Sequence, residues 1–101
     1  MIIIFTTIHD RKQTKRMAKG LVMERLVACV NILPVESVFR WKGKLEEIRE
    51  QLLILKTTKK NFKKIERYIK KHSGYEIPEI VAIPASAVHA PYLKWVKAET
   101  K

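Results

Sequence analysis

Residues 27–57 read VACVNILPVESVFRWKGKLEEIREQLLILKT, and this stretch decides the fold. Its two runs rich in β-branched, aromatic and other apolar residues, 27–41 and 44–57, predict two long strands. The Lys-Gly pair at 42–43 joins them in a short turn, where glycine supplies the positive φ that hairpins need. Pro34 donates no ladder hydrogen bond, so it must lie at an edge, a bulge or a break in the first strand.

The elements on either side of this hairpin complete an α+β pattern. In chain order we expect a strand at 2–7, a helix at 10–26, the two hairpin strands, a helix at 61–72, a strand at 80–84 and a short closing helix at 90–98. Asp10 and Gln13 have the spacing of a capping box at the start of the first helix. This order predicts a ferredoxin-like βαββαβ sandwich with a long central hairpin, in one domain over residues 1–101.

The hairpin is too long for the helices to cover. Strands rise about 3.3 Å per residue, so its arms would reach about 45 Å, whereas a helix of about 16 residues covers only about 24 Å. A bare apolar ribbon would be unstable and adhesive, so we predict a homo-oligomer with Val38, Phe39 and Trp41 in the interface. The alternative is a shorter hairpin that breaks at Pro34 and folds back on its own domain.

The composition predicts a water-soluble protein with a basic surface. Lys and Arg total 21 against 10 Asp and Glu, a net charge of +11. No apolar run has the length of a membrane span, the opening MIIIF has no basic leader, and a lone cysteine suits a reducing compartment, so we expect a cytoplasmic protein with no membrane partner. The apolar residues of 56–72 recur at helical spacing. The lysines between them therefore form either a solvated helix face or a polyanion-binding surface.

Five phrases occur in order over nearly the whole chain: VACVNI (27–32), RWKGKLEE (40–47), EQLLILKT (50–57), YEIPEI (75–80) and YLKW (92–95). Together they resemble the CutA family of divalent-cation tolerance proteins. The resemblance implies a ferredoxin-like subunit, a homotrimer held together by long hairpins, a cytoplasmic setting and an association with copper or another divalent metal. It also implies an architecture similar to PII-type signalling trimers, which bind small effectors in clefts between subunits.

Two residues are candidate metal ligands. Cys29, the only cysteine, is either a small hydrophobic side chain within its strand or a thiolate for Cu(I) or Zn(II) that needs further ligands from elsewhere. His72 matches the histidine to which the family's metal contacts are assigned, and it either ligates a metal or caps its helix. The family's other ligand, a cysteine near the end of the first strand, is Thr6 here, which cannot supply a thiolate. We expect any metal to be bound without being required for folding.

A polar set made of Glu47, Lys56, Tyr75 and Glu76 is the candidate ligand-binding or inter-subunit site. Charged groups in strands and turns beside an interface must be paired or must hold a ligand, and a structural salt bridge is the alternative. Catalysis finds no support, because the chain has no glycine-rich phosphate loop and no assignable triad, and Cys29 has no evident basic neighbour to activate it. We therefore expect no enzyme activity.

Nucleic-acid binding is the main alternative function. The RNA-recognition motif has the same element order, and the chain is basic. That module stacks bases on aromatic side chains of its central strands, whereas LLILKT has none and IIIFTT has only Phe5. We therefore favour a trimer that binds a metal ion or small ligand at inter-subunit clefts in divalent metal tolerance, and we consider nucleic acid an improbable partner.

Overall fold

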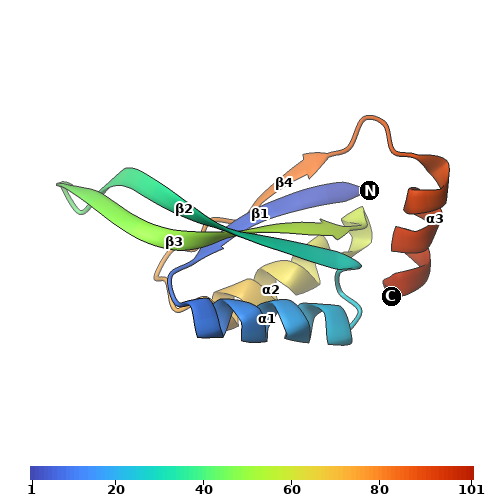
Figure 1. The fold of residues 1–101 in the computed structure, drawn as a ribbon, viewed down its shortest axis with the longest axis horizontal. Helices are drawn as coiled ribbons and strands as arrows, with labels where there is room; N and C mark the ends of the chain where they lie inside the picture. Colours follow the sequence, from blue (N-terminus) through green and yellow to red (C-terminus); the bar gives the residue numbers. More distant parts are fainter.

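The computed structural model describes all 101 residues and contains the expected order of elements (Figure 1). These are β1 (Ile2–Ile8), α1 (Arg11–Met23), β2 (Cys29–Trp41), β3 (Lys44–Thr57), the 3-10 turn η1 (Lys59–Asn61), α2 (Phe62–His72), β4 (Val81–Pro84) and α3 (Ala90–Glu99). The strands form one antiparallel sheet in the order β2-β3-β1-β4. Helices α1 and α2 lie on one face of the sheet, and α3 packs at one end of it (Figure 1). The predicted α+β fold is confirmed.

The hairpin is continuous through Pro34. Strands β2 and β3 pair along their whole length, with Pro34 opposite Gln51. Proline is tolerated here because β2 is the edge strand of the sheet, where an outward N–H has no partner to lose. The alternative of a hairpin broken at Pro34 is therefore wrong.

The turn at Lys42 and Gly43 directs the hairpin away from the rest of the molecule. Both residues have a positive φ, 49° and 79°, which suits the right-handed twist of the two strands. The molecule is 45 Å long, and the hairpin projects past the ends of α1 and α2 (Figure 1). The outer half of the ribbon has no helix beside it, as the length argument requires.

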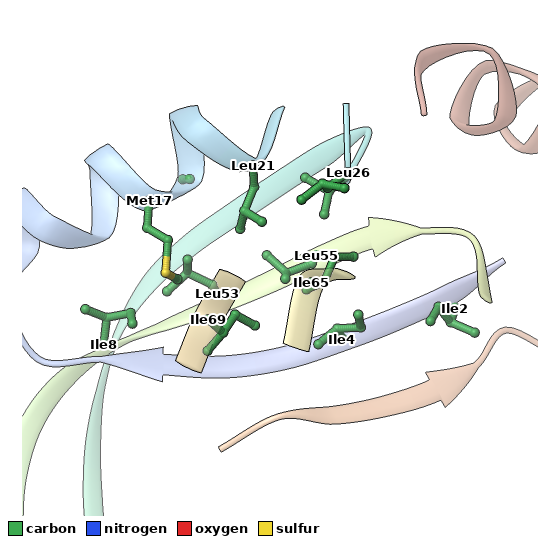
Figure 2. Close-up of a cluster of buried hydrophobic side chains, with 12 residues drawn as sticks. Ile2, Ile4, Ile8, Met17, Leu21, Leu26, Leu53, Leu55, Ile65 and Ile69 are labelled. Atoms are coloured by element: carbon green, nitrogen blue, oxygen red, sulfur yellow. The ribbon is translucent and has the colours of Figure 1, made fainter. Parts of the chain in front are cut away.

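The core lies between the sheet and the two helices (Figure 2). Residues two apart in a strand point to the same face, and helix residues three or four apart share a side, so both patterns converge on one layer. The buried cluster consists of Ile2, Ile4, Ile8, Met17, Ala18, Leu21, Leu26, Val27, Leu53, Leu55, Ile65 and Ile69. Val22 on α1 lies outside this cluster and is 42% exposed.

The opposite face of the sheet is apolar and has no helix over it (Figure 1). The strand register places Phe5, Ile54 and Val81 side by side on this face. By the same alternation the apolar residues of the face are Ile3, Phe5, Leu33, Leu52, Ile54, Val81 and Ile83, and Thr7, Cys29, Asn31 and Lys56 lie on the same face beside them. The sequence analysis expected exposed apolar surface only in the hairpin, and the structure adds this second area, called the open sheet face below.

The predicted capping box at the start of α1 does not form. Asp10 caps the helix by accepting a hydrogen bond from the backbone N–H of Lys12 at 3.0 Å, and the hydroxyl of Thr14 donates to the Asp10 carbonyl at 2.8 Å. The Gln13 amide instead donates to the carbonyl of His72. This contact joins the start of α1 to the end of α2. The Gln13 side chain therefore makes a tertiary hydrogen bond in place of the local one that a capping box would contain.

The connection from α1 to β2 is longer than expected and is tied to α3. Arg25 adopts a φ of 59°, which ends the helical path three residues early. Its guanidinium donates to the carbonyls of Ala98 and Glu99 at 2.5 and 3.1 Å, and its own carbonyl accepts from the backbone N–H of Lys101 at 2.9 Å. The end of α1 and the end of the chain therefore lie side by side.

Substituting Ile65, which is fully buried, should destabilise the protein strongly. Ile65→Ala leaves a cavity between α2 and the sheet and should lower the free energy of unfolding by about 2–5 kcal/mol. The matched control is Val22→Ala on α1, which should change it by no more than about 0.5 kcal/mol because that side chain is half-exposed. Urea unfolding followed by circular dichroism, at one protein concentration, measures both; equal effects would contradict the core described above.

Candidate functional site

A groove of about 750 Å³ lies between the projecting hairpin and the loop that follows α2. Its hairpin wall includes the aromatic rings of Phe39 and Trp41, and its loop wall is the segment around Tyr75. The charged residues that line it are Lys42, Glu46, Glu50, Glu76 and Glu79. Four of the ten acidic residues thus line one groove against a single lysine, in a chain with a net charge of +11. The groove is a local acidic site on a basic protein.

Tyr75 and Glu50 form the central polar contact of this groove. The Tyr75 hydroxyl donates to Oε1 of Glu50 at 2.8 Å, and Glu50 is only 6% exposed. Burial, followed by the hydrogen bond and the charge of Glu50, raises the pKa of Tyr75 well above its usual value. The hydroxyl therefore remains protonated at neutral pH and serves as the donor that a buried carboxylate needs.

Glu50 was missed by the sequence analysis, which named Glu47 instead. Side chains alternate along β3, so Glu46, Ile48 and Glu50 face the groove while Glu47 lies on the other side of the ribbon. Glu50 could have been identified from its position two residues before Leu52. Side chains two apart in a strand face the same side, and Leu52 belongs to the open sheet face.

Glu76, which was predicted, does line the groove. Its carboxylate lies 3.8 Å from the ammonium of Lys42, and both side chains are about two-thirds exposed, at 66% and 68%. An exposed pair of this kind contributes little to stability. Glu76 and Lys42 are consequently free to exchange this contact for one with a ligand.

Lys56 lies elsewhere, so the predicted polar set is divided between two places. Lys56 is opposite Cys29 in the β2–β3 register, and its ammonium donates to Oδ1 of Asn31 and lies 3.9 Å from the Cys29 sulfur. Cys29 therefore does have a basic neighbour, contrary to the sequence analysis, and it is partly exposed rather than fully buried. The contact was missed because the two residues are adjacent only across strands.

The predicted metal ligands do not meet within one chain. Cys29 is paired with Lys56 just before α2 begins, whereas His72 ends that helix, and the 11 residues of α2 span about 16 Å. The His72 ring packs against Tyr68 with centroids 4.4 Å apart, and Thr6 is fully buried in the core. Nowhere do three His, Cys, Asp or Glu side chains form a group that could hold a metal ion. The residues of a single chain do not fit a metal site.

The fold and the groove can now be compared with known proteins. Residues 2–99 match the family model described as CutA1 divalent ion tolerance protein. The chain belongs to the CutA1 family. The resemblance identified from the five sequence phrases is thereby confirmed.

Relatives in this family come from distant organisms. The divalent-cation tolerance protein CutA of Thermus thermophilus is 39% identical over 97% of this chain and 96% of its own length. The chloroplastic protein CutA of Arabidopsis thaliana is 36% identical over 99% of this chain but 56% of its own. The chain therefore spans little more than half the length of some CutA relatives and nearly all of others.

Solved structures of the family have the same fold. CutA1 from Pyrococcus horikoshii superposes with a TM-score of 0.96 at 37% identity, covering 100% of this chain and 99% of that one. The protein from Nostoc, described as PII-like, has a TM-score of 0.94 at 34% identity and covers 100% and 98%. The protein from Archaeoglobus fulgidus, described as periplasmic, has a TM-score of 0.96 at 33% identity and covers 100% of both chains.

Removing the Tyr75 hydroxyl should cost stability because it leaves a buried carboxylate without its donor. We expect Tyr75→Phe to lower the free energy of unfolding by about 1–3 kcal/mol. Because the pKa of Tyr75 is raised, this difference should be fully present below the ordinary phenol pKa of about 10 and should be lost only as the pH rises towards the raised value.

Urea unfolding at pH 7 checks this, with Tyr92→Phe as the matched control because no hydrogen bond of the Tyr92 hydroxyl is seen. The double variant Glu50→Leu with Tyr75→Phe should be more stable than the sum of the two single changes predicts, by at least about 0.5 kcal/mol. Equal losses in Tyr75→Phe and Tyr92→Phe, or strict additivity, would contradict the proposed contact.

Proposed function

We propose that this CutA1-family protein is a homotrimer that takes part in divalent metal tolerance by binding a divalent metal ion or a small ligand in clefts between subunits. The observation that carries the proposal is the acidic groove beside an exposed apolar hairpin, where Val38 is 64% and Phe39 39% exposed. The family description, divalent ion tolerance, is consistent with a role in handling cations rather than in catalysis.

Two apolar areas of the single chain support self-association. One is the outer half of the hairpin, and the other is the open sheet face around Phe5 and Ile54. A solitary chain would leave both in water, which globular monomers avoid for contiguous patches of this size. Pairing with identical copies covers both areas and also protects the unpaired edge of β2. The number of three subunits comes from the family resemblance.

The groove supports binding of a cation. Carboxylate oxygens such as those of Glu46 and Glu79 suit hard divalent ions, whereas the Cys29 sulfur suits Cu(I). A complete metal site requires ligands from more than one chain, because no single chain supplies three. Assembly would bring the hairpin of one copy to the groove of another, and for this reason we place the site between subunits.

The protein's location and its need for metal in folding complete the proposal. None of the helices combines the length and the apolar character needed to cross a membrane. We propose a cytoplasmic location from the lone cysteine, although relatives are described as chloroplastic or periplasmic. We also propose that metal is not needed for folding, since a cluster of 12 buried apolar side chains forms the core between the sheet and the helices.

A charge at Val38 should break the assembly without unfolding the chain. In the single chain Val38 is 64% exposed, so Val38→Glu costs little there, but in an interface it would bury a carboxylate without a partner. Light scattering after gel filtration at micromolar concentration should give three chains' mass for the wild type and one chain's mass for the variant. The matched control is Met23→Glu on α1, 82% exposed, which should remain trimeric. A monomeric wild type would overturn the proposal.

Zinc titration should locate the cation site. Glu46→Gln with Glu79→Gln removes two groove carboxylates and should weaken Zn(II) binding, measured by calorimetry, at least about tenfold. The matched control is Glu36→Gln with Glu47→Gln, which removes the same charge from the other side of the ribbon and should leave binding unchanged within about twofold. Cys29→Ser and His72→Ala test the two ligands predicted from sequence. Loss of Zn(II) binding in those variants, with none in the groove pair, would move the site out of the groove.

A further inference from the structure

A second hollow, of about 370 Å³, lies on the helix side of the molecule, away from the groove and the open sheet face. It is formed where one side of α2 meets the end of α1 and the end of the chain. Its lining residues are Glu24, Leu26, Lys64, Arg67, Tyr68, Lys71 and Lys101. Helices α1 and α2 lie on the sheet face opposite the open sheet face (Figure 1), so the basic hollow would remain accessible in the proposed trimer.

The cations of the basic hollow are arranged in a row and form no ion pair, and Glu24 is the one acid that lines the hollow beside them. Lys64, Arg67 and Lys71 follow the i, i+3, i+7 spacing that places side chains on one side of a helix. None of them takes part in the ion pairs of the structure, and the only acid of α2, Glu66, pairs with Lys63 at 3.6 Å. Like charges this close repel one another, so the row is less favourable empty than with an anion bound.

Tyr68 adds a positioned hydroxyl to this row. Its ring packs against that of His72, and its oxygen lies so close to Gly20 that a Cβ on that glycine would approach it to 2.0 Å. Burial, and then the nearby carboxylate of Glu24, raise the pKa of Tyr68 above its ordinary value. A phenol hydroxyl in the lining of a hollow with four cations can donate a hydrogen bond to a phosphate oxygen.

Two hydrogen bonds hold the backbone of Lys101, the fourth cation of the hollow. The backbone N–H of Lys101 donates to the carbonyl of Arg25, and the Asn61 side chain donates to the Lys101 carbonyl at 3.5 Å. Asn61 is itself buried, and it also donates to the carbonyl of Leu26 at 3.2 Å. The hollow is therefore bounded by elements with fixed relative positions.

We infer that the basic hollow binds a linear polyphosphate, either free or as the phosphate chain of a nucleotide. From Lys64 to Lys71 the α2 backbone rises about 10.5 Å, so a chain of three linked phosphates laid along the helix would place one phosphate beside each cation of the row. The guanidinium of Arg67, in the middle of the row, can bind two phosphate oxygens at once. This site is separate from the acidic groove, and the inference stands or falls independently of the function proposed there.

Calorimetric titration of the full chain with sodium tripolyphosphate tests the inference. The wild type should bind one tripolyphosphate per chain, and Arg67→Gln with Lys71→Gln should weaken binding at least about tenfold, since each contact to a charged group lost costs about that factor. The matched control, Lys12→Gln with Lys94→Gln, removes two exposed lysines outside the hollow and should change affinity by less than about twofold. Tyr68→Phe should weaken binding while leaving the net charge unchanged.

Titrations with ATP and with a single-stranded RNA identify the source of the phosphates. Tighter binding of ATP than of tripolyphosphate supports a nucleotide ligand, and equal affinity supports free polyphosphate. Absence of tripolyphosphate binding, or equal losses in the hollow variant and its control, would overturn the inference. It would equally be overturned if a single-stranded RNA bound the wild type and tripolyphosphate failed to displace it, because the basic residues would then act as a diffuse polyanion surface.

Discussion

A mismatch of length between the strands of the hairpin and the helices beside them determines most of the structure. Strand β3 has 14 residues and would span at most about 43 Å when extended, while α1 and α2 have 13 and 11 residues and span about 20 and 16 Å. Two helices can therefore build a core only against half of the hairpin. The other half, together with the open sheet face, has no helix of this chain to cover it, and the groove beside Tyr75 exists because the hairpin projects.

Residues of opposite charge gather on the two sides of the molecule. The projecting hairpin and the loop after α2 contribute the carboxylates of the acidic groove, whereas α2 carries a row of cations on the helix side. A net charge of +11 describes neither region. The residues lining the groove and those lining the basic hollow are therefore of predominantly opposite charge.

The sequence analysis was most accurate where periodicity is strong and least accurate where contacts cross between elements. Ile65 and Ile69 on α2 and Leu53 and Leu55 on β3 were in the right elements because apolar spacing reports burial directly. Among the site residues, Tyr75 and Glu76 line the groove, but Glu47 does not and Glu50 was missed. A one-residue difference along a strand reverses the side on which a carboxylate lies, and only the tertiary structure shows that Tyr75 pairs with Glu50.

The sequence by itself determined the element order, the long hairpin with its Lys-Gly turn, the excess of apolar surface and membership of the CutA1 family. These follow from local conformational preference and from side-chain periodicity, which need no knowledge of distant partners. Only the tertiary structure decided that Tyr75 donates to Glu50 and that Lys56 lies beside Cys29. It also decided that the Gln13 amide donates to the carbonyl of His72 at the end of α2, and that Cys29 and His72 lie apart. Each of these depends on strand register or on the docking of a helix end, and many segments of the chain acting together set those geometries.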